Sequence, residues 1–187
     1  ITNLFDLQRY QNIHDSLYSS EPLEILPESF GISGISCLRV NEGSKEVQSY
    51  LCVVPGEFLA QIYEKYGSKL LEQNVRVFLQ ARTLVNKGII ETATSFPDSF
   101  FSYNNGITAT ATDLKLRKTQ NGPEITSLTN LQLVNGGQTT ASLLYAKQNG
   151  KADLSKVFVQ MKLSMIPDEL VREVVPRIAQ YSNTQNK

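Results

Sequence analysis

Several features are scarce or absent in this chain of 187 residues, and their absence narrows the classes of protein to consider. The formal net charge is zero, which argues against strong non-specific binding to nucleic acid or to membranes. No apolar run is long enough to cross a membrane and no signal-peptide pattern is present, so we expect a cytoplasmic protein without membrane partners. The length fits one domain, or one domain with a small companion.

The residues of metal and hydrolase chemistry are also few. The single histidine, His14, has no cysteine or histidine neighbour at ligand spacing, so we expect no metal site. Cys37 and Cys52 fall in neighbouring strand-like segments and, without a secretory signal, are predicted to be buried thiols rather than a disulfide. No Ser/His/Asp set, Cys/His pair or close carboxylate pair appears. Whether the protein is an enzyme, and which cofactor it uses if any, therefore stay open.

The spacing of apolar and turn residues predicts a mixed α/β or α+β fold, a small sheet flanked by helices. A weak amphipathic pattern over residues 1–20 predicts a docking helix, and Pro176 is expected to kink or split the last helix. Strands are predicted over 32–40, 47–54, 100–103, 107–112, 131–134 and 157–163, and helices over 57–66, 85–94, 138–149 and 167–181, with 70–79 ambiguous.

Residues 131–149 are the most informative part of the chain, and we expect them at the centre of the sheet. A short apolar strand is followed by the turn Asn135-Gly136-Gly137 and then by a helix. Glycine accepts φ > 0 and leaves no side chain to block a ligand. The first amides of a helix lack intrahelical acceptors, and the helix dipole is positive there. An anion pocket is therefore predicted, lined by Asn135, Gly136, Gly137, Gln138, Thr139 and Thr140.

The same turn also fits a simple corner of an α/β fold. It is not a Walker loop, because the lysine that contacts phosphate before the Ser/Thr is missing. It is not a dinucleotide fingerprint either, because only two glycines are present and they are adjacent. The local pattern therefore leaves two interpretations open, a phosphate or nucleotide site and a structural corner.

Three corners rich in Asn and Gln stand out, and each also fits a turn or a cap. Neutral amides offer both a donor and an acceptor, which suits a base edge, a sugar or a phosphate oxygen. We expect the three corners to converge on one small ligand. Beside them, Arg76 and Lys87 are the expected cations, although Arg76 also fits a structural pair with a carboxylate. The candidates outside the 135–140 loop are Asn104, Asn105, Gly106, Asn183, Gln185, Arg76 and Lys87.

The corner Asn104-Asn105-Gly106 also carries a specific structural prediction. Asn-Gly between strand-like runs is the strongest short-range signal for a β-hairpin, because a type I′ turn needs φ > 0 at both central residues. We therefore predict strands on both sides of this corner and a positive φ at Gly106.

Five motifs follow one another along the chain: LEQNVRVFL at 71–79, VNK at 85–87, FFSYNNGIT at 100–108, LVNGGQTT at 133–140 and SNTQN at 182–186. In this order they resemble the AIPR family, the abortive infection phage resistance proteins of bacteria. The resemblance implies defence against phage alongside partner proteins, but no established chemistry. It covers about residues 51–187, which we interpret as an AIPR-like domain cut at its C-terminus, while residues 1–50 form an unmatched helix and hairpin segment.

The segment Val134–Thr140 also resembles, more weakly, the Asp-Gly-Gln-Gln-Arg motif of domains similar to ParB and sulfiredoxin. Several of these domains bind or hydrolyse nucleotides. Here Asn135 replaces the acidic residue and Thr139 replaces the arginine, so the resemblance implies binding more than hydrolysis.

The sequence therefore supports three hypotheses. The first is a domain of a phage-defence protein that senses a nucleotide or nucleic acid. The second is part of a nucleic-acid-processing enzyme whose catalytic residues lie outside this chain, since both ends look cut. The third is a module that binds partner proteins of the defence system.

Overall fold

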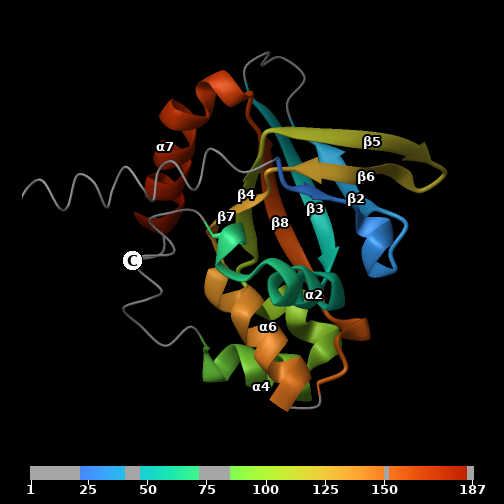
Figure 1. Ribbon diagram of the computed structural model, residues 1–187. Helices are drawn as coiled ribbons and strands as arrows, with labels where there is room; N and C mark the ends of the chain where they lie inside the picture. The colour runs from blue at the N-terminus through green and yellow to red at the C-terminus, as the bar shows by residue number, and fades with distance from the viewer. Residues whose placement is uncertain (1–21, 41–46, 72–84, 150–151, 185–187) are drawn as a thin grey trace, which may run out of the picture.

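The computed structural model describes residues 22–40, 47–71, 85–149 and 152–184, and shows a mixed α/β fold with a curled sheet of eight strands (Figure 1). Seven strands follow the order β1-β6-β2-β3-β8-β4-β7, and β5 pairs with β6. The strands are β1 (Glu24–Ile25), β2 (Ile35–Arg39), β3 (Gln48–Pro55), β4 (Ile107–Ala111), β5 (Asp113–Thr119), β6 (Gly122–Thr129), β7 (Gln132–Asn135) and β8 (Phe158–Met165).

The described helices complete the fold. Short 3₁₀ turns connect several elements, and one of them, η3 (Pro97–Ser99), leads directly into a helix. The α-helices are α2 (Gly56–Tyr66), α4 (Lys87–Ser95), α5 (Phe100–Tyr103), α6 (Gly137–Asn149) and α7 (Val171–Thr184).

The predicted unit at 131–149 is confirmed as β7 followed by α6, but its expected place at the centre of the sheet is wrong. β7 is the last strand in the described order, beyond β4. The centre is held by β3 and β8, which pair antiparallel over eight residues of each strand. β7 has only four residues, and on the side away from β4 its Leu133 forms a single parallel bridge with Leu71.

Helices cover β7 from both sides. α6 packs between α2 and α4, and the three form the group below the sheet in Figure 1. Leu133 belongs to the main core, whereas Val134 belongs to a second cluster with Val175 and Ala179 of α7. Consecutive residues of a strand point to opposite faces, so the main core and α7 lie on opposite sides of β7.

The predicted hairpin around Asn104-Asn105-Gly106 is wrong in its first half. The chain enters this corner from helix α5 and leaves it as β4. Phe100 is fully buried at the start of α5, directly after a 3₁₀ turn begun by Pro97. Burial of this ring favours a helical turn over the strand that its aromatic neighbours suggest. The positive φ expected at Gly106 is confirmed, at 76°.

Of the two effects expected from Pro176, a kink or a split of the last helix, the split is wrong. α7 is one helix from Val171 to Thr184 with Pro176 inside it, so the chain is not split there. Its apolar stripe includes Val174 and Ile178, as predicted, but Tyr181 is 63% exposed. The predicted docking helix over 1–20 and most of the ambiguous segment 70–79 lie outside the described residues.

Candidate functional site

The Gly136 corner joins β7 to α6 and is tightly packed. Gly136 has φ 90°, and a Cβ at this position would lie 2.9 Å from the Cα of Ile107 on the neighbouring strand. A side chain here would therefore meet both an unfavourable dihedral angle and the backbone of β4. Gly137 is the first residue of α6, so only the first glycine makes the turn.

The Gly106 corner lies at the same end of the sheet. A Cβ on Gly106 would lie 2.5 Å from the carbonyl oxygen of Gln160 on β8. The next residue, Ile107, is the one that contacts the Gly136 corner. Two corners that the sequence singled out are thus adjacent across β4.

The third corner, at the C-terminal end of α7, is joined to β7 by side-chain hydrogen bonds. The Nδ2 group of Asn135 donates to the carbonyl oxygen of Ser182 at 2.8 Å. The Nδ2 group of Asn183 donates to the carbonyl oxygens of Val134, at 3.2 Å, and Ala179, at 2.7 Å. The amides of both asparagines therefore act in part as structural links, and whether a ligand also uses them stays a prediction.

Asn104 and Asn105 differ in their roles. The Oδ1 atom of Asn104 accepts a hydrogen bond from the backbone N–H of Gly106 at 2.9 Å, an Asx turn that stabilises the corner. Asn105 is exposed. Of the two side chains, Asn105 is therefore the one open to solvent.

Thr139 and Thr140, in the first turn of α6, were expected to line the anion pocket, but their side chains are buried. Thr139 is 5% exposed and Thr140 is fully buried. The hydroxyl of Thr140 donates to the carbonyl oxygen of Gly136 at 3.3 Å. Their side chains thus belong to the interior, and the backbone N–H of Thr140 also donates to the carbonyl oxygen of Gly136. Within α6, the candidate ligand donors are therefore the backbone amides before Thr140 and the half-exposed Gln138.

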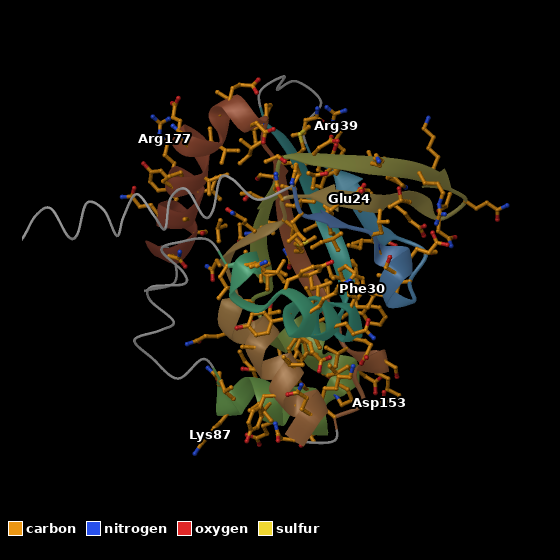
Figure 2. The ribbon with its side chains drawn as sticks, in the orientation of Figure 1. Glu24, Phe30, Arg39, Lys87, Asp153 and Arg177 are labelled. Atoms are coloured by element: carbon orange, nitrogen blue, oxygen red, sulfur yellow. The ribbon has the colours of Figure 1, made fainter. Side chains whose placement is uncertain are left out.

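Neither Glu124 nor Asp153 seals the N-terminus of α6, because both carboxylates are paired elsewhere. Glu124 forms an ion pair with Arg117 at 2.8 Å, on the β5–β6 hairpin. Asp153 accepts hydrogen bonds from the hydroxyl and the backbone N–H of Ser155, and these lower the pKa of its carboxyl group. Figure 2 shows Asp153 at the lower edge of the molecule.

Of the two expected cations, Lys87 is among the described residues and Arg76 is not. Lys87, labelled in Figure 2, is exposed at the start of α4. The preceding residue, Asn86, caps α4 and donates its backbone N–H to the hydroxyl of Ser142 at 2.9 Å. This contact places the start of α4 beside the middle of α6 rather than beside its N-terminus. Arg76 and Gln185 lie outside the described residues.

One cation near the Gly136 corner was missed. Lys162 of β8 pairs with Thr108 of β4, which in turn pairs with Asn135 of β7. Directly paired residues share a face of the sheet, and neighbouring strands lie about 4.8 Å apart, so the Cα atoms of Lys162 and Asn135 are roughly 10 Å apart. The alternation over 157–163 was a usable signal, since it already placed Lys162 on the polar face of that strand.

The buried thiols match their prediction. Cys37 and Cys52 are free, buried and directly paired across β2 and β3. Burial raises the pKa of the Cys52 thiol to about 12, and it also raises the pKa of Cys37. Such thiols stay protonated and inert at neutral pH. Within the described ranges, no cluster of three His, Cys, Asp or Glu residues is placed to hold a metal ion.

The fold and these corners define a mixed α/β domain whose polar residues gather where β4, β7 and α7 meet. The family model described as AIPR protein matches residues 71–187, more than half of the chain, so the chain belongs to the AIPR family. Membership implies phage resistance by abortive infection. No curated protein and no solved structure gives a significant match. None of the described helices is long and apolar enough to cross a membrane.

Proposed function

We propose that the Gly136 corner binds the phosphate of a nucleotide or nucleic acid, and that this binding is the sensing step of the abortive-infection response. The observation that carries the proposal is the meeting of the three corners. Ile107 contacts Gly136, and hydrogen bonds join Asn135 and Asn183 to the neighbouring elements. Polar turns from three parts of the sequence thus meet at the end of β7, and this supports a shared site there.

Electrostatics support an anion at this position. The first backbone N–H groups of α6 point out of its N-terminus, which is also the positive end of the helix dipole. The attraction between this dipole and an anion is worth roughly 0.3–1 kcal/mol when the anion is exposed and up to about 2 kcal/mol when it is partly buried. Asn135 and Gln138 are half-exposed and add amide groups beside them. The phosphate would be held mainly by backbone amides, because Asn135 and Thr139 stand where the ParB-like motif has charged residues.

Within the described residues, two observations argue against a nucleic-acid-processing enzyme and against a module that binds partner proteins. The central strands β2, β3, β4 and β8 contain no aspartate or glutamate, so they offer no carboxylate pair for a nuclease. The apolar stripe of α7 is packed against Val134 and Ile166, so it leaves no broad apolar patch there for a partner protein.

The test is isothermal titration of the 187-residue chain with ATP, GTP and inorganic phosphate. We expect saturable binding of a nucleotide, and at a ligand concentration of 100 Kd a stabilisation of about 2.7 kcal/mol. Gly137→Val and Gln138→Ala should weaken this binding at least tenfold, with an unchanged circular dichroism spectrum. Gln120→Ala, in the exposed β5–β6 turn, is the matched control. Equal affinity in both folded variants, or no binding of any probe, would show that the loop is only a corner.

A further inference from the structure

The open face of the sheet next to the Gly136 corner carries an ordered row of side chains along β8. Phe158, Gln160 and Lys162 alternate with the buried residues Val159, Met161 and Leu163. Phe158 is 43% exposed, although it is a large aromatic residue. Successive members of the row are about 6.7 Å apart, since a strand rises about 3.3 Å per residue. An aromatic ring, an amide and a cation thus follow one another at nearly equal steps.

The neighbouring strands extend this face and connect it to the corner. Leu51 and Val53 of β3 pair with Lys162 and Gln160, and are 39% and 41% exposed. On the other side of β8, the Lys162–Thr108–Asn135 row leads to the Gly136 corner. The face therefore extends from the exposed Leu51 and Val53 of β3, its apolar floor, across Lys162 and Thr108 to Asn135, the residue before Gly136.

The charge on these strands favours a polyanion. On this face, β2, β3, β4 and β8 carry one basic residue, Lys162, and no acidic residue, whereas Arg39 pairs with the buried Tyr50 and lies on the other face. The neutral net charge of the whole chain therefore hides a local region without negative charge. A protein partner would need only the apolar floor, whereas the aromatic, amide and cationic groups match the base, base edge and phosphate of a nucleotide chain.

We infer that this face binds single-stranded nucleic acid, with one base stacked on Phe158 and a phosphate beside Lys162. The inference rests on the proposed function, because the strand would continue from the phosphate held at the Gly136 corner. Exposed aromatic side chains on a sheet are a general means of binding unpaired bases, because every base offers a flat face to the ring. Duplex nucleic acid has its bases stacked inside and does not fit this row.

The test is fluorescence anisotropy of the 187-residue chain with labelled 12-nucleotide oligo(dT) and oligo(U), and with a 12-base-pair duplex as competitor. We expect saturable binding to a single strand that weakens with salt. Phe158→Leu keeps an apolar side chain but removes the ring, and should weaken binding roughly fivefold to a hundredfold. Lys162→Gln should weaken it and lower the slope of log K against log salt by about 0.7. Phe96→Leu on the end of α4 and Lys118→Gln on β5 are the matched controls, and both should bind as the wild type does.

The outcomes separate this inference from the proposed function. Mononucleotide titration of Phe158→Leu should match the wild type, because Phe158 is not part of the Gly136 corner. If mononucleotides bind but no single strand binds at about 100 µM protein and low salt, only the present inference fails. If Phe158→Leu and Lys162→Gln bind oligonucleotides like the controls, the face is not the binding surface, and a protein partner on the apolar floor becomes the better explanation. If neither kind of ligand binds, the proposed function fails as well.

Discussion

The Gly136 and Gly106 corners use the same residue types and lie side by side, but they are stabilised in different ways. At Gly106 the stabilising bond is local, from the backbone N–H to Asn104 two residues earlier. At Gly136 it comes from Asn135, whose Nδ2 group reaches Ser182, 47 residues further along the chain. One corner is therefore a turn that short-range chemistry specifies, and the other is a joint between two elements that exists only in the folded protein.

The largest effect is expected from Gly136→Ala. The new Cβ would lie 2.9 Å from the Cα of Ile107, and φ is 90°. Backbone strain and overpacking should together lower the free energy of unfolding by about 3 kcal/mol or more, measured by urea denaturation. Gly31→Ala is the control, because Gly31 has φ 80° with nothing within 4 Å of the added Cβ, and should cost only about 1–2 kcal/mol. Equal costs at both positions would show that packing against β4 is unimportant.

Gly106→Val should follow with a somewhat smaller loss. Its φ of 76° is close to that of Gly31, so strain alone predicts about 1–2 kcal/mol. The carbonyl oxygen of Gln160, 2.5 Å from the added Cβ, should raise the cost above that of Gly31→Val. Urea denaturation of both variants gives the difference. If Gly106→Val lowers the free energy of unfolding no more than Gly31→Val does, the Gly106 corner can shift to accommodate the side chain, and its close contact with β8 does not constrain it.

Asn135→Asp tests the long-range joint. The side chain of Asn135 donates its hydrogen bond, and aspartate at neutral pH has no proton to donate. The carboxylate would instead face the carbonyl oxygen of Ser182, which should cost roughly 1–3 kcal/mol. The midpoint of urea unfolding should fall at constant m, and the cost should shrink in acid, where the carboxyl group regains a proton. A variant as stable as the wild type at pH 7 would mean that this hydrogen bond adds nothing.

Local chemistry accounts for what could be predicted from the sequence. Alternation located β3 and β8, and the Asn-Gly pair predicted the positive φ of Gly106. The helix before that glycine was missed, because a positive φ says nothing of the element that leads into it and Phe100 is buried by distant residues. The place of β7 at the end of the described strand order depends on pairing between strands, which no local pattern encodes.

Like the fold, the candidate site could be predicted from the sequence only where local chemistry determines it. Its turn residues stand out in the sequence because glycine and asparagine have a special backbone role. Lys162 does not stand out, because it becomes a neighbour of Asn135 only through the register of three strands. Lys87 attracted attention by its place in the chain and lies beside the middle of α6 instead. The position of a cation relative to a turn is thus a property of tertiary structure.

The smallest effect is expected from Asn104→Asp, the same substitution at the other corner. Asn104 uses Oδ1 as an acceptor for the N–H of Gly106, and a carboxylate oxygen accepts that bond equally well. The free energy of unfolding should therefore change by no more than about 0.5 kcal/mol. Asn104→Ala removes the acceptor and should cost more, about 0.5–1.5 kcal/mol. Urea denaturation of both variants beside Asn135→Asp completes the comparison. If aspartate is as harmful at 104 as at 135, the two corners are not distinguished by donor and acceptor roles, and the local nature of the Gly106 turn must be reconsidered.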